Sequence, residues 1–317
     1  MNKILITGGC GFIGSHLAEY IFKKFTKSEI IIYDKITYAA NRKYLSGITR
    51  SKRVRIVKAD INNLKKLISS TRKVDLLIHV AAESHVDKSF RLSNKFIITN
   101  VLGTSNVMEA ARVNRIKKII HVSTDEVYGE IFKGSFTEDD KFNPSNPYSS
   151  SKAAAEMIVN GYKHSYKLPV IIIRSNNIYG SRQYPEKLIS GCCLSLIKKR
   201  KFYLHGNGQQ KRTFLYVKDF CDAVYRIIVN KKNINPIYNI GSHDELKNIE
   251  VVKLICNFLK VDFKKNIFFK KDRPFNDFRY SVNFSRLKKL SWKPKSRFIQ
   301  KLPELIEWYK KNKNLFI

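Results

Sequence analysis

A tyrosine and a lysine one helical turn apart are the first residues in this sequence that could do chemistry. Three serines separate Tyr148 from Lys152, so both side chains share one face if this segment is helical. A nearby ammonium group stabilises a phenolate and lowers the tyrosine pKa toward that of a general base. Such pairs are also frequent on ordinary helix surfaces, so the surrounding elements must decide between the two interpretations.

Four polar residues, from Ser123 to Glu126, come at the end of an apolar run at residues 118–123 that predicts a strand. Ligands of open α/β sheets bind at the carboxyl ends of the strands. The hydroxyl of Thr124 could therefore meet a sugar hydroxyl there. The adjacent carboxyls of Asp125 and Glu126 could exchange protons with a ligand, although such a pair is also typical of a solvated turn.

A glycine-rich loop lies between a predicted strand at residues 3–7 and a predicted helix at residues 13–25. Its glycines, Gly8, Gly11 and Gly14, permit a tight turn and let backbone N–H groups approach a pyrophosphate. The strand–loop–helix context favours a dinucleotide site over a purely structural turn.

Two further strand ends fit a dinucleotide. Asp34 closes the second predicted strand, 20 residues after Gly14. A carboxylate at this point accepts the ribose hydroxyls and repels a 2′-phosphate, so we expect NAD rather than NADP. Asp60 and Ile61 follow the third predicted strand and would lie near the adenine, unless they form only a turn.

The elements that must position these residues alternate between strands and helices, which is typical of parallel βαβ units. Several strands are apolar without alternation, as expected of strands covered on both faces. We therefore predict an α/β fold, a doubly wound parallel Rossmann sheet with a smaller α/β substrate-binding region. The predicted strands are residues 3–7, 30–34, 54–58, 76–81, 118–123 and 170–174, with helices at 13–25, 64–71, 94–113 and 149–166.

Glycines and prolines break the second half of the chain into shorter pieces, with helices predicted at residues 187–199, 218–230, 250–259 and 302–311. We assign residues 1–176 to an NAD-binding domain and residues 177–317 to a region that binds the rest of the ligand. Some segments of the second region are expected to return to the first domain.

The composition limits the possible partners. Sixty Lys and Arg residues against 26 Asp and Glu residues give a formal net charge of +34. These basic residues are spread along the whole chain, so we expect no dedicated nucleic-acid site. The positive electrostatic potential of such a chain would still attract acidic small molecules.

The five cysteines show no CxxC spacing, so we expect neither a disulfide framework nor a bound metal. No apolar run is long enough to span a membrane, and the first residues lack the layout of a signal peptide. We expect a cytoplasmic protein without a membrane partner.

With these motifs in place, the sequence resembles the extended short-chain dehydrogenases/reductases, and within them the nucleoside-diphosphate-glucose 4,6-dehydratases. The resemblance covers nearly the whole chain. Its Asp125-Glu126 pair separates the dehydratases from relatives that only epimerise C4. The matching segments are residues 8–15, 34–38, 81–87, 123–129, 148–152, 184–188, 238–241 and 272–277.

The resemblance implies a reaction in which a sugar is oxidised, dehydrated and reduced again. Tyr148 takes the proton of the glucose 4-hydroxyl while a hydride leaves C4, with Lys152 favouring the phenolate and Thr124 bonding the 4-keto oxygen. Glu126 then removes the C5 proton, and a protonated Asp125 donates to the departing 6-hydroxyl. Two carboxyls that share one proton suit this step, because like charges raise one pKa.

The resemblance also implies which residues surround the two ligands. For NAD these are Gly8, Gly11, Phe12, Ile13, Gly14, Asp34, Lys35, Thr37, Asp60, Ile61, Ala81, Ala82, Ser84, Thr99, Tyr148, Lys152 and Asn177. For the nucleoside-diphosphate-glucose they are Ser84, Thr124, Asn177, Lys187, Leu188, Tyr203, His205, Arg212, Asn239, Arg273 and Asn276.

The base of the nucleotide is less strongly specified. The segment Arg273-Pro274-Phe275-Asn276-Asp277 resembles the dehydratase part of plant-type UDP-rhamnose synthases, whereas bacterial dTDP-glucose enzymes typically have Gly-His at its centre. We expect UDP-glucose first and dTDP-glucose second, with the product leading to rhamnose or another 6-deoxy sugar.

Two further expectations concern assembly and the class of protein. The resemblance implies a homodimer formed through the predicted helices at residues 94–113 and 149–166. The alternative from another class is a non-catalytic protein of the same fold that binds NAD or nucleic acid.

Overall fold

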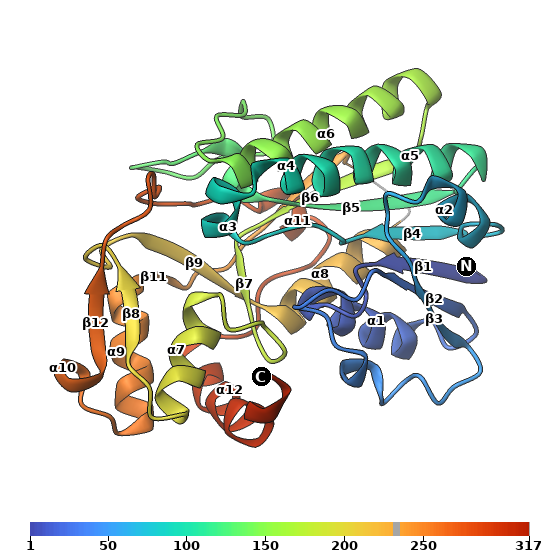
Figure 1. Ribbon diagram of the computed structural model, residues 1–317. Coiled ribbons are helices and arrows are strands. Elements are labelled where there is room, and N and C mark those ends of the chain that lie inside the picture. Colours follow the sequence, from blue (N-terminus) through green and yellow to red (C-terminus); the bar gives the residue numbers. More distant parts are fainter. Residues whose placement is uncertain (231–234, 317) are drawn as a thin grey trace.

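A seven-stranded parallel sheet forms the centre of the computed structural model, which describes residues 1–230 and 235–316. The strands lie in the order β10-β6-β5-β4-β1-β2-β3, and the order reverses between β1 and β4 (Figure 1). In such sheets the crevice for a ligand lies at this reversal, beyond the carboxyl ends of the strands. The strands are β1 (Lys3–Thr7), β2 (Glu29–Asp34), β3 (Val54–Lys58), β4 (Leu76–His79), β5 (Lys118–Thr124), β6 (Val170–Ser175) and β10 (Ile237–Ile240).

Helices cover both faces of this sheet, which explains why its strands are apolar on both sides. In Figure 1, α4, α5 and α6 lie above the sheet, and α1 and α8 lie below it. The helices around the sheet are α1 (Phe12–Lys24), α2 (Leu64–Ser70), α3 (Val86–Arg91), α4 (Ser93–Phe96), α5 (Gly103–Val113), α6 (Pro147–Tyr166) and α8 (Val217–Val229). Shorter turns are η1 (Arg42–Leu45), the π-helical η2 (Ile97–Leu102) and η3 (Asp125–Tyr128).

Apart from α8, which packs on the large sheet, the second region holds two small sheets and five helices among its described residues. One sheet pairs β9 (Lys211–Tyr216) with β7 (Asn177–Tyr179) and β11 (Glu245–Lys247), and the other pairs β8 (Phe202–His205) with β12 (Ile267–Lys270). The helices are α7 (Leu188–Ile197), α9 (Asn248–Leu259), α10 (Phe263–Asn266), α11 (Ser285–Lys288) and α12 (Phe298–Asn312), followed by the turn η4 (Lys313–Leu315). Segments from the second half of the chain return to the large sheet, since β10 pairs with β6 and α8 packs on α1.

All six predicted strands are present, with ends displaced by no more than two residues. The helix predicted at residues 94–113 is wrong in one respect, because the π-helical turn η2 separates α4 from α5. Within this turn the Asn100 side chain is buried, and its amide donates to the Glu83 carbonyl and the Ser151 hydroxyl. The turn thus fastens this helix to the loop after β4 and to α6.

The last helix begins four residues before its predicted start, at Phe298. The Phe298 ring is buried against Tyr179 and Phe214, with ring centres 5.0 and 5.3 Å apart, and Pro303 remains inside the helix. The strand β10 was not predicted, because only four residues separate the breaking residues Pro236 and Gly241.

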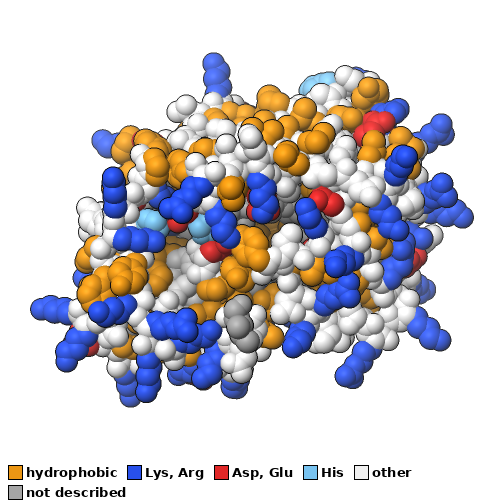
Figure 2. Space-filling view, in the orientation of Figure 1, with side chains coloured by type: hydrophobic (Ala, Val, Ile, Leu, Met, Phe, Trp, Pro, Cys, Tyr) orange, Lys and Arg blue, Asp and Glu red, His pale blue; other side chains and the backbone are white. Residues whose placement is uncertain are grey.

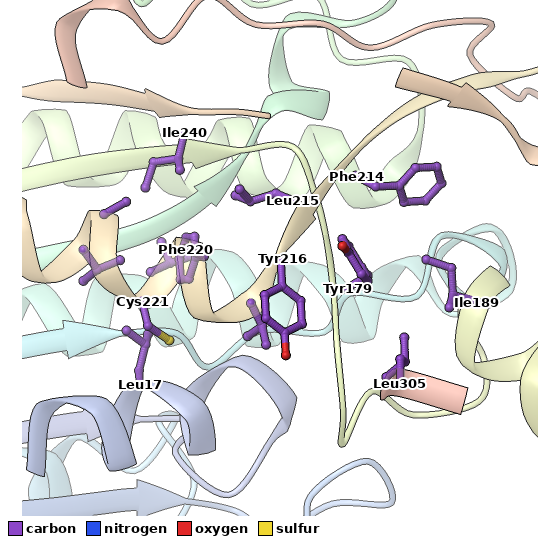
Figure 3. Packing of buried hydrophobic residues seen from close by; sticks show 14 of the residues in the cluster. Leu17, Tyr179, Ile189, Phe214, Leu215, Tyr216, Phe220, Cys221, Ile240 and Leu305 are labelled. Atoms are coloured by element: carbon purple, nitrogen blue, oxygen red, sulfur yellow. The ribbon is translucent and has the colours of Figure 1, made fainter. Parts of the chain in front are cut away.

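One apolar cluster joins the large sheet to the second region. Figure 3 shows Tyr179, Phe214 and Ile189 on one side of this cluster and Leu17, Phe220 and Cys221 on the other. Because interiors are close-packed, this shared core holds the two regions at a fixed separation. The space between them is therefore shaped by the fold itself.

A buried ion pair connects the sheet to helix α6. Arg174 on β6 donates to both oxygens of Glu156 on α6, with an Nη2–Oε2 distance of 2.8 Å, and the two side chains are 3% and 0% exposed. Arg174 also donates to the Tyr128 hydroxyl at 2.6 Å, and that hydroxyl donates to Asn239 at 2.9 Å. The guanidinium therefore ties α6, the end of η3 and β10 to one strand.

We predict that Glu156→Gln lowers the free energy of unfolding by about 3–5 kcal/mol, because it leaves the Arg174 charge buried without its partner. The double change Glu156→Leu and Arg174→Met should recover much of that loss, since it removes both charges together. Urea denaturation of the three proteins measures these differences.

The matched control is Glu307→Gln, which breaks the exposed Lys310–Glu307 pair on α12. This change should cost less than about 1 kcal/mol. A similar cost for both single variants, or a double variant no more stable than Glu156→Gln, would show that burial does not set the strength of this pair.

Candidate functional site

A cavity of about 540 Å³ opens beyond the carboxyl ends of the strands of the large sheet. One wall comes from the segments that follow β1, β2, β4, β5 and β6, and the opposite wall comes from the second region. The cavity lies where the strand order reverses, as expected for a doubly wound sheet.

The glycine loop forms one end of this cavity, and its close contacts leave no room for side chains. Gly8 has a φ of +69°, and a Cβ there would lie 2.8 Å from the Ala81 backbone. A Cβ on Gly14 would lie 2.1 Å from the Gly8 carbonyl oxygen. Helix α1 starts at Phe12, and its N-cap Gly11 supplies no side-chain hydrogen bond. The first N–H groups of α1 therefore remain available for an anion such as a pyrophosphate.

Acidic residues at the next two strand ends line the same part of the cavity. The Asp34 carboxyl accepts hydrogen bonds from the N–H groups of Cys10 at 2.9 Å and Ile36 at 2.6 Å. Burial raises the pKa of Asp34, and the two N–H donors oppose that shift. Asp60 forms an ion pair with Lys35 at 2.6 Å. This polar end suits the ribose and adenine of a dinucleotide.

The structure brings all the residues predicted around NAD to this one cavity. The predicted residues of its lining are Gly8, Gly11, Phe12, Ile13, Gly14, Asp34, Lys35, Thr37, Asp60, Ile61, Ala81, Ala82, Ser84, Thr99, Tyr148, Lys152 and Asn177. The glycine cradle, the uncapped helix start and the strand-end carboxylates fit the parts of NAD that they would meet.

The predicted acid–base pair sits in the turn directly after β5. Thr124 ends that strand, and its hydroxyl accepts the N–H of Glu126 at 3.2 Å, which fixes the turn η3. Asp125 is 3% exposed and accepts a hydrogen bond of 2.7 Å from the amide nitrogen of Asn176. Burial, aided by the Glu126 charge, raises the pKa of Asp125 to about 7.

Burial also raises the pKa of Glu126, while the cations Lys187 and Arg212 oppose that shift. Two carboxyls with raised pKa values thus face one cavity. The alternative interpretation of this pair as part of a solvated surface turn is therefore excluded. At neutral pH this pair can both hold a proton and accept one.

Tyr148 and Lys152 lie on the first turns of α6, which begins with a capping box between Asn146 and Ser149. The Lys152 ammonium donates to the Val122 carbonyl at 2.8 Å. Burial lowers the pKa of Lys152 to about 8, with the Glu156 charge opposing this shift. The pair is therefore buried and not on an ordinary helix surface.

The expected lowering of the Tyr148 pKa is wrong for this structure. Burial, together with the charges of Glu126 and Asp125, holds the pKa of Tyr148 above its usual range. The Lys152 ammonium is directed to the Val122 carbonyl, and desolvation weakens its own charged form.

The second region contributes cations to the opposite wall. Arg212 is 8% exposed, and its guanidinium donates to the Asn276 side chain at 3.0 Å and lies 4.5 Å from the centre of the Tyr280 ring. Arg273 pairs with Asp87, and burial lowers the pKa of Lys187. The predicted substrate residues that line this wall are Lys187, Leu188, Arg212, Arg273 and Asn276.

Three predicted substrate residues, Asn239, Tyr203 and His205, do not line the cavity. Asn239 is fully buried, with its amide donating to the Phe136 and Asn283 carbonyls. Tyr203 is 50% exposed on β8. His205 lies 3.2 Å from the Asp87 carboxylate, which also pairs with Arg273. The resemblance implied that these three residues contact the substrate. For Asn239 the buried side-chain contacts contradict this role, whereas the roles of Tyr203 and His205 stay predictions.

Residues that the sequence analysis missed also face the cavity, among them Asn176, Asp277 and Tyr280. Asp277 is 2% exposed and accepts a hydrogen bond from Ser145 at 2.6 Å and another from Tyr280. Asn176 could have been predicted as a cavity residue, because it directly follows β6 and precedes Asn177 at the carboxyl edge of the sheet.

Within residues 1–230 and 235–316, the structure also bears on metal sites, disulfides and membrane-spanning helices. This part of the chain contains no cluster of three or more His, Cys, Asp or Glu side chains arranged to hold a metal ion. The five cysteines are buried and unpaired. No helix in these residues is long and apolar enough to cross a membrane.

Comparison with known proteins supports the resemblance seen in the sequence. Residues 5–305 match the family described as GDP-mannose 4,6 dehydratase. A dTDP-D-glucose 4,6-dehydratase from Dictyostelium discoideum is 39% identical over 363 residues, which cover 100% of this chain and 83% of that protein. A trifunctional UDP-glucose 4,6-dehydratase, epimerase and reductase from Arabidopsis thaliana is also 39% identical, and the match covers 98% of this chain and 47% of that longer protein.

Solved structures agree with this result. A dTDP-glucose 4,6-dehydratase from Streptomyces venezuelae, crystallised with NAD and TYD, superposes with a TM-score of 0.96 at 34% identity, covering 99% of this chain and 98% of that one. The enzyme from Bacillus anthracis, in complex with NAD, gives a TM-score of 0.91 at 37% identity, covering 100% and 99%. The predicted Rossmann fold is confirmed, and the chain belongs to the GDP-mannose 4,6 dehydratase family of extended short-chain dehydrogenases/reductases.

Proposed function

We propose that this protein is an NAD-dependent nucleoside-diphosphate-glucose 4,6-dehydratase, with UDP-glucose as its preferred substrate. The observation that supports this most strongly is the meeting of two acid–base pairs in one cavity. Tyr148 and Lys152 come from α6, and Asp125 and Glu126 come from η3, beside a glycine loop suited to a dinucleotide.

NAD, when bound, supplies the acceptor for a hydride from C4 of the glucose and returns that hydride to C6. The uncapped start of α1 after Gly11 would hold its pyrophosphate, and Asp34 would accept its ribose hydroxyls. Because the hydride leaves and returns within one turnover, the cofactor is not consumed.

The first step is proton removal from the 4-hydroxyl group. Tyr148 is the proposed base, and Thr124, which lines the same cavity, would donate a hydrogen bond to the oxygen that becomes the 4-ketone. Burial raises the pKa of Tyr148, so this step needs a positive charge near the phenolate; the charged form of Lys152, one turn away on the same helix, would supply it as the proton leaves.

The second step is loss of water across C5 and C6. A 4-ketone acidifies the C5 proton, which Glu126 removes, while Asp125 donates a proton to the departing 6-hydroxyl. The raised pKa of Asp125, about 7, keeps a substantial fraction protonated at neutral pH. One C–H bond and one C–O bond break, a double bond forms between C5 and C6, and one water leaves. Return of the hydride to C6 from the bound cofactor and protonation of C5 by Glu126 or water would then give the 4-keto-6-deoxyglucose nucleotide.

The diphosphate is proposed to lie against the cations of the second region. Arg212 and Arg273 present guanidinium groups that suit phosphate oxygens, and Lys187 adds a third charge at the same wall. The high net positive charge of the chain, +34, would also draw an anionic substrate toward the cavity.

The proposal of UDP over dTDP depends on the segment from Arg273 to Asp277, which resembles plant-type UDP-rhamnose synthases. Within it, Phe275 and Asn276 line the cavity, and Asn276 accepts the hydrogen bond from Arg212. Relatives named for dTDP-glucose and for UDP-glucose are about equally similar to this chain, so identity alone does not choose. We further propose that the product serves a pathway to rhamnose or another 6-deoxy sugar.

Assembly as a homodimer is proposed from the helical layer above the sheet in Figure 1. Large apolar side chains on this layer are exposed, namely Ile97, Ile98, Leu102, Met157 and Tyr166. A twofold pairing of η2–α5 with α6 would cover them. Light scattering should therefore give twice the 36.9 kDa chain mass at micromolar concentration, and a monomer would contradict this.

The free cysteines suit a reducing compartment, so we propose the cytoplasm as the location of this protein.

The alternative of a non-catalytic nucleic-acid-binding protein is less well supported. Figure 2 shows Lys and Arg side chains spread over the whole visible face and not gathered in one stripe. Salt-dependent binding to duplex DNA, without turnover of any nucleotide sugar, would favour that alternative.

For the cofactor, we predict that the protein binds NAD more tightly than NADP by a factor of about ten or more, because the Asp34 carboxylate repels a 2′-phosphate. Asp34→Ala should narrow this difference. Isothermal titration calorimetry measures both affinities, and equal affinity of the parent protein for NAD and NADP would remove the role assigned to Asp34.

For the substrate, the purified protein is incubated separately with UDP-glucose and dTDP-glucose. We predict a product lighter by one water, and a kcat/KM for UDP-glucose about tenfold higher, since a methyl group and a hydroxyl distinguish the two nucleotides. A faster reaction with dTDP-glucose would reverse the base assignment, and no product from either would refute the proposed activity.

For the acid–base pair, Asp125→Asn and Glu126→Gln should slow water loss by roughly 10²–10⁴-fold. C4 oxidation does not need these carboxyls, so NADH should accumulate in a single turnover followed by nicotinamide absorbance. Tyr148→Phe is the matched comparison and should give no NADH signal. Carboxyl variants that lose the signal as fully as Tyr148→Phe would disprove this division of roles.

A further inference from the structure

The carboxyl of Asp125 is held in place by a residue from the neighbouring strand, Asn176. The Asn176 amide nitrogen donates to Asp125 Oδ2 at 2.7 Å, and both residues are 3% exposed. Asn176 directly follows β6, and its backbone N–H donates to the Ile240 carbonyl on β10 at 3.0 Å. A rigid strand end thus fixes the position of this amide.

Packing on the other side of the amide keeps it in this orientation. A Cβ on Gly241 would lie 2.7 Å from Asn176 Oδ1, so the oxygen end of the amide fills the space that the missing side chain leaves. With its oxygen against Gly241, the amide presents its nitrogen to Asp125. Asn176 also lines the cavity beside Asn177.

The hydrogen bond distinguishes the two oxygens of the Asp125 carboxyl. Both oxygens accept a hydrogen bond, but Oδ2 accepts the shorter one, 2.7 Å from the Asn176 amide, whereas Oδ1 accepts a longer one, 3.3 Å from the Thr124 hydroxyl. The stronger bond holds negative charge on Oδ2, so a proton on this carboxyl is favoured on Oδ1. Oδ1 is also the oxygen beside Thr124, the residue proposed to contact the 4-keto oxygen of the sugar.

We propose that Asn176 is a positioning residue for proton donation, which turns the Asp125 carboxyl so that Oδ1 carries the proton to the departing 6-hydroxyl. Asn176 also stabilises the carboxylate that remains after the proton has left, through a charge-assisted hydrogen bond. This inference rests on the proposed dehydratase function and goes beyond it, because the reaction itself requires only a proton donor.

The surroundings of Asp125 determine how a change at Asn176 will alter its titration. Glu126 in the same turn raises the pKa of Asp125, while Arg212 on β9 and the hydrogen bonds from Asn176 and Thr124 lower it. From α6, Tyr148 is close enough for the Asp125 charge to raise its pKa. Loss of the Asn176 N–H destabilises the charged form of Asp125 more than the neutral form, so the pKa should rise.

The test is Asn176→Leu, which keeps a similar volume but removes the donor. Water loss should slow by about 10–100-fold, while NADH formation in a single turnover stays within about threefold of the parent. A donor must be protonated, so activity falls as pH rises through the Asp125 pKa. We therefore expect the alkaline limb of the kcat profile to move up by roughly one pH unit.

A double-mutant cycle separates positioning from a general structural effect. If Asn176 acts through Asp125, then Asn176→Leu should cause no further slowing in an Asp125→Asn background. Independent, multiplying effects would overturn the proposal, as would an unmoved alkaline limb or an Asn176→Leu protein that dehydrates at the parent rate. Failure of the proposed function is distinct, because the parent protein itself would then form no dehydrated product.

Discussion

The buried guanidinium of Arg174 holds together the two halves of the acid–base machinery. Through Glu156 it fixes helix α6, which carries Tyr148 and Lys152, and through the Tyr128 hydroxyl it fixes the end of η3, which carries Asp125 and Glu126. A full charge inside a protein is tolerated only when every part of its surroundings is well arranged. This requirement restricts how far the helix and the turn can move relative to each other.

The same exclusion of water that demands this arrangement also sets the chemistry of the site. Burial raises the pKa of Asp125 to about 7 and lowers that of Lys152 to about 8, so these two groups exchange protons near neutral pH more readily than they would in water. For Tyr148 burial has the opposite effect, because it raises the pKa above its usual range and favours the protonated phenol. Glu156 has two effects in this respect, because its charge both balances Arg174 and opposes the loss of charge on Lys152. The structural ion pair and the proposed catalytic pair are therefore linked electrostatically.

Much of this arrangement could be predicted from the sequence, since it depends on local signals. The glycines at 8, 11 and 14, the acid at the end of β2 and the polar residues after β5 are set by their place in strand–loop–helix units. What could not be predicted depends on contacts distant in sequence. The resemblance assigns Asn239 to the diphosphate, yet its amide donates hydrogen bonds to the carbonyls of Phe136 and Asn283.

The other unpredicted features have similar causes. The π-helical turn η2 arises where Asn100 turns inward to reach Glu83 and Ser151, partners that no local pattern identifies. The bond between Asn176 and Asp125 joins two adjacent strands across 51 residues of sequence. Periodicity and propensity describe one element at a time, whereas these contacts follow from how the elements pack.

The central claim is that one sugar is oxidised at C4, dehydrated and reduced at C6 within a single cavity. Conversion of UDP-glucose that carries deuterium at C4, followed by NMR or mass analysis of the product, tests it most directly. The account predicts that the deuterium is found at C6 of the 4-keto-6-deoxy product, with none released as free labelled cofactor. Deuterium that is lost to solvent, or that remains at C4, would contradict it.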